Sequence, residues 1–360
     1  MKASLRGSRL HAFICPRSIR AAVTMRVGVI GVGNMGQNHA RVYAEIADLV
    51  GIADPDVKAG GALLERLPVR NYFPDYRNLL KEDIDAVSIC VPTSLHARIA
   101  LDSIRAGVHV LVEKPLAPTV AAAERIVDAA QRARVTLAVG HVERHNPAIA
   151  LVKRQLDAGD YGNLITVSAR RVSSFPTRVR DIGVILDLGV HDIDVMRYLV
   201  GSRVESVFAL SGRRLHERFE DHANILLRFS DGVHGFLEVN WLTPTKVRHL
   251  ALTCQKSFVE VDYTDQSVTV SSATLGRLDP FNLYEVPLEH HVRRIHVRKE
   301  EPLRLELEDF LRAAKTGRAP LVTGRDAIET LRVVEAAIVS RQLGHAITLT
   351  PPRRTRRRAS

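Results

Sequence analysis

Long apolar runs are missing from this chain of 360 residues. Charged residues or glycine interrupt every hydrophobic stretch within about ten positions, whereas a membrane-spanning helix needs about 20 apolar residues in succession. Neither a membrane span nor a membrane partner is therefore expected. A hydrophobic fraction of 46% is still enough to fill two cores, and a chain of this length usually divides into two domains.

Cysteine is also scarce, with three residues that lie far apart in the chain. Cys15, Cys90 and Cys254 offer neither a disulfide framework nor the close spacing of a zinc knuckle. This usage is typical of a reducing compartment, so we expect a cytoplasmic protein.

Acidic residues are absent from both ends of the chain, which carries a net charge of +11. Ten of the eleven excess positive charges lie in residues 1–24 and 351–360, namely Lys2, Arg6, Arg9, Arg17, Arg20, Arg353, Arg354, Arg356, Arg357 and Arg358. The middle is thus nearly neutral, unlike the charged folded face of a nucleic-acid-binding protein. We expect two disordered basic tails and no nucleic-acid partner, with polyanion binding by the tails as the alternative.

Residues 1–24 are rich in arginine, as in an organellar transit peptide, but lack the apolar core and cleavage site of a secretory signal. Met25 directly precedes a strand pattern, so translation could instead begin there. On either interpretation this segment lies outside the predicted fold.

Residues 25–145 alternate short apolar runs with amphipathic stretches, which predicts a parallel sheet with crossover helices. The runs are rich in valine and isoleucine, as expected of strands covered on both faces. They are residues 26–31, 49–54, 86–91, 108–113 and 135–140, with helices at 34–47, 94–106 and 119–133. The segment is therefore predicted to be an α/β Rossmann domain that binds a dinucleotide.

Residues 146–350 have the pattern of an α+β domain. A helix (147–157), a strand (164–174) and a helix from Gly189 come first. Strands with period-two alternation follow at 203–211, 222–230, 233–241, 247–253 and 258–263, and helices close the chain at 303–315 and 325–342. Tight turns between strands predict an open, mostly antiparallel sheet with one face free for a substrate or partner.

A glycine-rich turn joins the first predicted strand to the first helix. Its pattern is G-x-G-x-x-G, made by Gly31, Gly33, Asn34, Met35 and Gly36 with Val32. In this context the glycines permit the tight turn, the close approach of a diphosphate and close packing of helix on strand. A plain glycine-rich turn is the alternative.

Asp54 ends the second run, where a carboxylate can bind ribose hydroxyls and would repel a 2′-phosphate. We therefore expect NAD rather than NADP, unless Asp54 only shapes the turn or Arg66 or Arg70 binds a phosphate. Thr93, Ser94 and His96 follow the third run at the same edge of the sheet, where they are expected to contact the cofactor or, for Thr93 and Ser94, to cap the helix.

Lys114 ends the fourth run at this edge, close to where a reacting hydroxyl would lie. Its ammonium can donate a hydrogen bond to the hydroxyl oxygen or, when neutral, accept a proton; a solvated surface lysine is the plainer interpretation. Asp187 and His191 lie four residues apart and so share a face at the start of a helix. A histidine oriented by a carboxylate is a suitable acceptor for the proton lost in alcohol oxidation.

For other candidate groups, packing or solvent exposure is a better explanation than ligand binding. His290, His291 and His296 lie among arginines on a segment expected to be irregular and solvated, not at a metal site. Asp187, His191 and Asp194 look like metal ligands, but hydride transfer to NAD needs no metal and none is assigned. Trp241 and Tyr263 are expected to be buried rather than to stack on a base.

Four stretches, GVGNMG, EKP (113–115), GHVERHNP (140–147) and DLGVHDID (187–194), resemble the glucose-fructose oxidoreductase, inositol dehydrogenase and rhizopine-catabolism (Gfo/Idh/MocA) family over residues 25–350. The resemblance implies an NAD-dependent oxidoreductase acting on CH–OH, with Lys114, Asp187 and His191 as its catalytic group. It also implies a homodimer or homotetramer. By the same motifs, Glu113 is expected to contact the cofactor and Asn146 the substrate.

Within this family, residues 140–147, 181–199 and 240–248 are similar to the branch that oxidises the 3-hydroxyl of UDP-N-acetylglucosamine. Related members oxidise the corresponding UDP-uronic acid, whose carboxylate needs a basic partner. Arg171, Arg178 and Arg180 could bind that carboxylate or the diphosphate, so they do not decide between the two. A non-catalytic NAD-binding sensor is an alternative of another class, although it would have no need of the catalytic group.

Overall fold

The computed structural model describes residues 24–176, 182–275 and 288–350. The predicted disordered tails lie outside the described residues, and so do Arg178 and Arg180. Within the described ranges, no helix is both long and apolar enough to cross a membrane.

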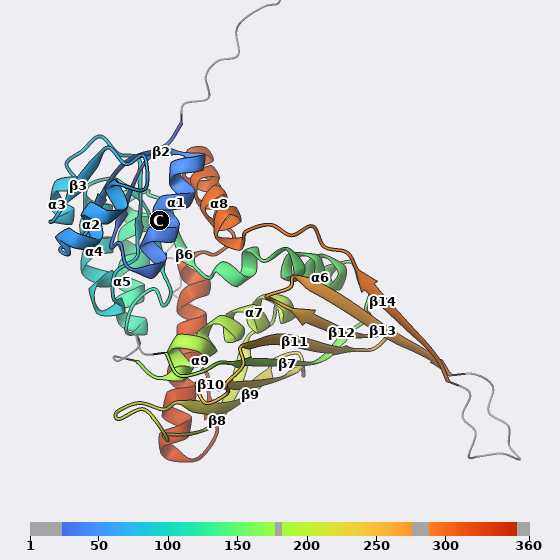
Figure 1. The fold of residues 1–360 in the computed structure, drawn as a ribbon. Coiled ribbons are helices and arrows are strands. Elements are labelled where there is room, and N and C mark those ends of the chain that lie inside the picture. The colour runs from blue at the N-terminus through green and yellow to red at the C-terminus, as the bar shows by residue number, and fades with distance from the viewer. Residues whose placement is uncertain (1–23, 177–181, 276–287, 351–360) are drawn as a thin grey trace, which may run out of the picture.

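A six-stranded parallel sheet with the order β3-β2-β1-β4-β5-β6 forms the first half of the molecule (Figure 1). Its strands are β1 (Arg26–Ile30), β2 (Asp48–Ala53), β3 (Asn71–Phe73), β4 (Ala86–Ile89), β5 (His109–Glu113) and β6 (Leu137–Gly140). Its helices are α1 (Asn34–Ile46), α2 (Val57–Leu64), α3 (Tyr76–Leu79), α4 (Thr93–Arg105) and α5 (Val120–Ala133). The predicted Rossmann domain is confirmed, with β3 as an additional edge strand.

A nine-stranded sheet with the order β14-β13-β12-β11-β7-β10-β9-β8-β15 forms the second half. Its strands are β7 (Leu164–Val172), β8 (Val204–Gly212), β9 (His222–Phe229), β10 (His234–Asn240), β11 (Val247–Cys254), β12 (Phe258–Asp262), β13 (Ser267–Leu275), β14 (Leu288–Ile295) and β15 (Ile347–Thr348). All neighbouring pairs are antiparallel except β7 with β10, which confirms the mostly antiparallel sheet.

The predicted irregular segment around residues 290–296 is wrong. β13 and β14 form an antiparallel pair at one edge of the sheet, and His290 and His291 lie on β14 with exposed side chains. Their strand is rich in polar residues because it has no buried face of its own, so the alternation that marks a half-buried strand is missing.

The helices of the second half cover one face of the large sheet (Figure 1). They are α6 (Pro147–Asp157), α7 (Val190–Val200) and α9 (Gly324–Leu343). The remaining helix, α8 (Pro302–Thr316), returns to the first half and packs on α1, where Leu307 and Phe310 join the core of the Rossmann sheet. Residues 146–350 therefore contribute to both halves of the molecule.

Candidate active site

The glycine-rich turn between β1 and α1 has the space that a diphosphate needs. Gly31 has a φ of +89°, and a Cβ on Gly36 would lie 1.8 Å from the Gly31 carbonyl oxygen, so both positions require glycine. A Cβ on Gly33 would meet nothing within 4 Å, and no side chain of the described residues caps α1. Asn34 and Met35 are exposed in the first turn. The N–H groups at this helix end are thus suited to an anionic diphosphate.

Asp54 follows β2 and ties its end to the glycine-rich turn. One carboxylate oxygen accepts the N–H of Val32 at 2.7 Å, and the other accepts the N–H of Asp56 at 2.8 Å. A carboxylate has about four lone-pair sites, so acceptors remain for ribose hydroxyls. Asp54 therefore shapes this turn, and its remaining acceptors are compatible with the predicted contact with the ribose.

The start of α4 differs in part from the prediction. Pro92 occupies the N-cap position, and neither Thr93 nor Ser94 makes a capping hydrogen bond within the described ranges, which leaves both hydroxyls for a ligand. His96 is 1% exposed, and its ring nitrogens lie 2.8 Å from the Pro115 carbonyl oxygen and 2.9 Å from that of Val91. His96 thus joins two loops inside the protein instead of contacting the cofactor as we expected.

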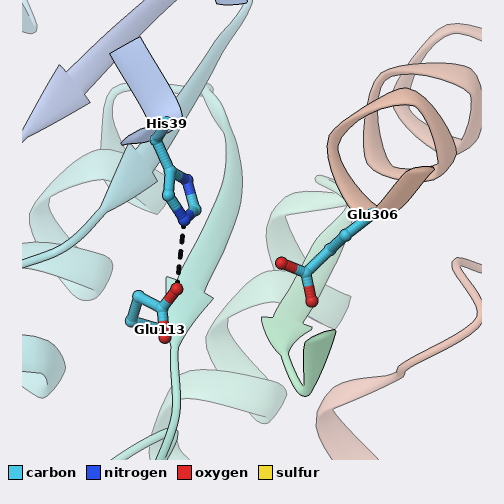
Figure 2. Close-up of side chains that lie close together, drawn as sticks. All are labelled: His39, Glu113 and Glu306. Atoms are coloured by element: carbon cyan, nitrogen blue, oxygen red, sulfur yellow. Dashed lines mark hydrogen bonds and ion pairs between the residues drawn. The ribbon is translucent and has the colours of Figure 1, made fainter. Parts of the chain in front are cut away.

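Glu113, at the end of β5, is buried within the protein. Its carboxylate lies 3.0 Å from Nε2 of His39 in α1 and accepts the N–H of Lys114 at 3.1 Å. Glu306 of α8 points toward the same place (Figure 2), and its carboxyl oxygens have no hydrogen-bond partner among the described residues. These three side chains, the Glu113 cluster, join α1, β5 and α8. Glu113 therefore uses its carboxylate inside the protein, on His39 and on the backbone of Lys114, whereas we expected it to contact the cofactor.

Different pKa shifts separate the two glutamates of the Glu113 cluster. Burial and the charge of Glu113 raise the pKa of Glu306 well above its usual value. Burial also opposes ionisation of Glu113, but the hydrogen bond and charge of His39 outweigh it and lower the pKa of Glu113. Glu113 therefore ionises more readily than Glu306, which keeps its proton to a higher pH than an ordinary glutamate.

The donor atoms of the Glu113 cluster lie within 4.8 Å of one another, a spacing that a metal ion could also bridge. His39 Nε2, the ring nitrogen nearest to that position, already bonds Glu113 at 3.0 Å. This hydrogen bond accounts for the proximity of His39 and Glu113 without a cation, whereas the Glu306 carboxyl makes no hydrogen bond among the described residues.

Lys114 contacts Asp187 directly. Its Nζ donates to the backbone oxygen of Asp187 at 2.9 Å and to Oδ1 at 3.1 Å, and both side chains are largely buried. We expected Asp187 to orient His191, but no hydrogen bond joins them in the described part of the chain. Asp187 lies in a π-helical turn, Ile185–Gly189, directly before α7, so the α-helical spacing that we assumed for Asp187 and His191 does not hold through this turn.

His191 lies at the start of α7 and is half-buried. Its Nδ1 is buried and has no hydrogen-bond partner among the residues that the structure describes. Burial, followed by the positive charges of Lys114 and Arg171, holds the pKa of His191 well below its usual value. The imidazole is therefore neutral at pH 7 and able to accept a proton.

Arg171 and Asn146, both expected to contact the substrate, are buried and fully engaged. Arg171 Nε lies 2.5 Å from Asp192 and Nη1 lies 3.1 Å from Glu143, and these carboxylates outweigh burial and raise the pKa of Arg171. Asn146 accepts the N–H of Ala148 at the start of α6 and donates to the Tyr263 carbonyl oxygen at 3.0 Å. Both residues support the site from inside.

A second buried ion pair joins Arg144 to Asp194. Two guanidinium nitrogens lie 2.7 Å from the carboxylate, which also accepts the hydroxyl of Thr330 at 2.9 Å. Nδ1 of His141 lies 3.8 Å from the same carboxylate. This pair connects the 3-10 turn Val142–His145 with α7 and α9.

Sequence analysis missed these partners of Arg171 and Asp194. The available signal was the presence of charged residues, such as Asp192 and Asp194, inside apolar stretches, because buried charges need partners. The sequence does not show which charge pairs with which. Trp241 and Tyr263 are 1% and 4% exposed, so their predicted burial is confirmed.

Two family models match the chain in succession. "Oxidoreductase family, NAD-binding Rossmann fold" covers residues 25–141, and "GFO/IDH/MocA C-terminal domain" covers residues 149–260. A UDP-N-acetylglucosamine 3-dehydrogenase from Acidithiobacillus ferrooxidans is 32% identical over 318 residues, which are 88% of this chain and 96% of that protein. The chain belongs to the Gfo/Idh/MocA oxidoreductase family.

Other relatives agree with this assignment. A scyllo-inositol 2-dehydrogenase (NAD(+)) from Bacillus subtilis is 28% identical over 90% of this chain and 96% of that protein. The solved structure of the A. ferrooxidans enzyme is similar with a TM-score of 0.78 at 30% identity, covering 88% of this chain and 97% of the other. A levoglucosan dehydrogenase with NADH and levoglucosan, 20% identical with a TM-score of 0.81 over 91% of this chain and all of the other, shares the fold. This Gfo/Idh/MocA member is an NAD-binding oxidoreductase.

Proposed function

We propose that this oxidoreductase oxidises the 3-hydroxyl of UDP-N-acetylglucosamine to the ketone with NAD. The observation that supports alcohol oxidation is the contact of Lys114 with Asp187 beside the neutral His191. The substrate is supported by the 32% identity to the A. ferrooxidans enzyme over 88% of this chain.

The chain's own groups divide the work of the reaction. NAD, when bound, accepts the hydride that leaves carbon 3. Lys114, held by Asp187, donates a hydrogen bond to the hydroxyl oxygen, on which negative charge develops. His191 accepts the hydroxyl proton as the C=O bond forms. Because both groups are largely removed from water, their interactions with the developing charge are strengthened.

A panel of UDP-sugars mixed with NAD tests the proposal by NADH absorbance, with an aminotransferase to remove the ketone if equilibrium disfavours it. Lys114→Ala and His191→Ala should each lower kcat by about a hundredfold or more while NAD binding persists. Lys58→Ala, at an exposed lysine of α2, is the matched control and should leave kcat unchanged.

Two other experimental results would each support a different function. Oxidation of the UDP-uronic acid alone would identify this chain as a uronate 3-dehydrogenase of the same family. If no sugar or polyol is oxidised and Lys114→Ala changes nothing measurable, a non-catalytic NAD-binding sensor takes its place.

A further inference from the structure

Two positively charged side chains near the active site, Lys246 and Arg248, make no hydrogen bond to a carboxylate among the described residues, and Arg248 only shares Glu143 with Arg171 at a longer distance. Lys246 is exposed directly before β11, and Arg248 lies on that strand. We infer that Arg248, assisted by Lys246, forms an anion-binding subsite that takes the diphosphate of the substrate. The identity of this ligand rests on the proposed function.

The register of the large sheet places Arg248 close to the catalytic group. β11 pairs antiparallel with β7, and Arg248 lies directly opposite Arg171. Residues in such a pair project from the same face with Cα atoms about 5 Å apart. Arg171 binds Asp192, which follows His191 in the chain. Arg248 thus lies on the strand next to Arg171, close enough for its charge to act on His191 of α7.

The two paired arginines differ in how many guanidinium donors remain available to a ligand. The Arg171 side chain is 2% exposed and uses both Asp192 and Glu143. The Arg248 side chain is 35% exposed, and its Nη1 lies 3.6 Å from the same Oε1 of Glu143, beyond hydrogen-bond distance. Arg248 therefore keeps guanidinium donors for a ligand.

The charges around this position favour an anion. Arg171, Arg248 and Lys246 face two carboxylates, those of Glu143 and Asp192, while Lys114 and Asp187 balance each other. Burial and the neighbouring Arg171 lower the pKa of Arg248, and the charge of Arg248 is the main cause that lowers the pKa of Lys246. An anion bound between them would relieve this repulsion.

A diphosphate suits this subsite for two reasons. A guanidinium can bind two phosphate oxygens in parallel, and Lys246 supplies a second positive charge two residues earlier for the second phosphate. A uronic-acid carboxylate has the same chemistry but a single charge. The experiment must therefore distinguish the diphosphate from a carboxylate.

Arg248→Gln should raise the KM for UDP-N-acetylglucosamine by about 10- to 100-fold and change kcat by less than about threefold. The affinity for UDP alone, measured by calorimetry, should fall by a similar factor, whereas NAD affinity stays unchanged. Arg248→Lys should restore part of the UDP affinity. Arg170→Gln is the matched control. Arg170 precedes Arg171 on β7, so its side chain points to the opposite face of the sheet, where it pairs with Glu238, and UDP affinity should not change.

Unchanged UDP affinity in Arg248→Gln would overturn the inference. So would loss of NAD affinity and thermal stability together with UDP affinity in both Arg248 variants, because Arg248 would then only support the fold. A KM increase confined to the UDP-uronic acid would assign Arg248 to a carboxylate. If the wild type oxidises no nucleotide sugar yet binds UDP through Arg248, the subsite stands and the proposed function fails.

Discussion

His191 is kept neutral because burial and the charge of Lys114 both disfavour the imidazolium ion. A base must be unprotonated, so kcat/KM should be flat through neutral pH and fall only as the pH drops through the lowered pKa of His191. We expect the acidic limb of the pH profile to lie below pH 6.5, measured with saturating NAD. A midpoint above pH 7 would exclude His191 as the base.

Asp54 is expected to decide between the two nicotinamide dinucleotides. A 2′-phosphate would approach a carboxylate that is fixed by the N–H groups of Val32 and Asp56, and the two negative charges would repel. NADP should therefore bind about tenfold or more weakly than NAD, a difference of about 1.4 kcal/mol. Titration of both cofactors against intrinsic fluorescence measures this, and equal affinities would contradict it.

Glu306 makes stability depend on pH because its pKa is raised in the folded state. The folded protein then holds a proton that the unfolded chain loses above its ordinary pKa, so this contribution is present in acid and is lost as the pH rises. Glu306→Gln, a neutral mimic, should gain about 1–3 kcal/mol of unfolding free energy relative to wild type between pH 5 and pH 8.

Urea unfolding at several pH values measures this effect, with Glu308→Gln as the control on the same helix. A Glu306→Gln protein that is destabilised equally at every pH would contradict a neutral Glu306. Stoichiometric metal in the purified wild type would contradict it too.

Among the helices and strands, α7 is held to its surroundings by buried charges. Asp194 is 1% exposed and pairs with Arg144, so Asp194→Asn would remove the main counter-charge of a buried guanidinium and leave it only Asp326, which lies 3.6 Å away. We expect a loss of about 3–5 kcal/mol in unfolding free energy, measured by chemical denaturation. Asp160→Asn, at an exposed aspartate, should change little. A loss below about 1 kcal/mol for Asp194→Asn would show that the pair contributes little.

Sequence patterns predicted those elements whose side chains alternate or cluster by burial. The five valine-rich runs of the Rossmann sheet and the half-buried strands from β8 to β12 were found in this way. β3, β13, β14 and β15 were missed. β3 and β15 are only three and two residues long, and the described side chains of β14 are mostly exposed. β13 does alternate, with Val268 and Val270 buried, so its pattern could have been found. The π-helical turn before α7 was missed because residue spacing alone cannot distinguish it from an α-helix.

Site residues that belong to a local motif were predictable from the sequence. Contacts between side chains from distant segments were not. Gly31, Gly36 and Lys114 follow from motifs at the ends of parallel strands. The contact of Asp187 with Lys114 was not predicted, because it joins two segments 73 residues apart and the turn that holds Asp187 is not α-helical. The burial of Arg171 depends on carboxylates from two other segments, which no local pattern reveals.

At the scale of the whole molecule, the large sheet exposes several apolar side chains on the face opposite the helices, beside polar ones such as the Arg170–Glu238 ion pair. The exposed residues there include Phe236 and Leu226, which lie directly opposite each other on β10 and β9, and Ile165 on β7. Such a patch favours association, so we expect a homodimer or homotetramer through this face.

Light scattering at micromolar concentration should show the oligomer, and Phe236→Asp should dissociate it. Leu215→Asp, at an exposed leucine outside the strands, is the control and should leave the mass unchanged. A monomeric wild type would refute the prediction.

The return of α8 to the first half has a consequence for biosynthesis. Leu307 and Phe310 belong to the same core as β1 and α1, yet the ribosome makes them more than 250 residues later. The start of α9 likewise adds Ile328 and Leu331 to the other Rossmann core. Apolar surface of the nascent cofactor domain therefore stays exposed until nearly the whole chain has emerged from the ribosome. We expect chaperones that bind such surfaces during translation to bind this domain.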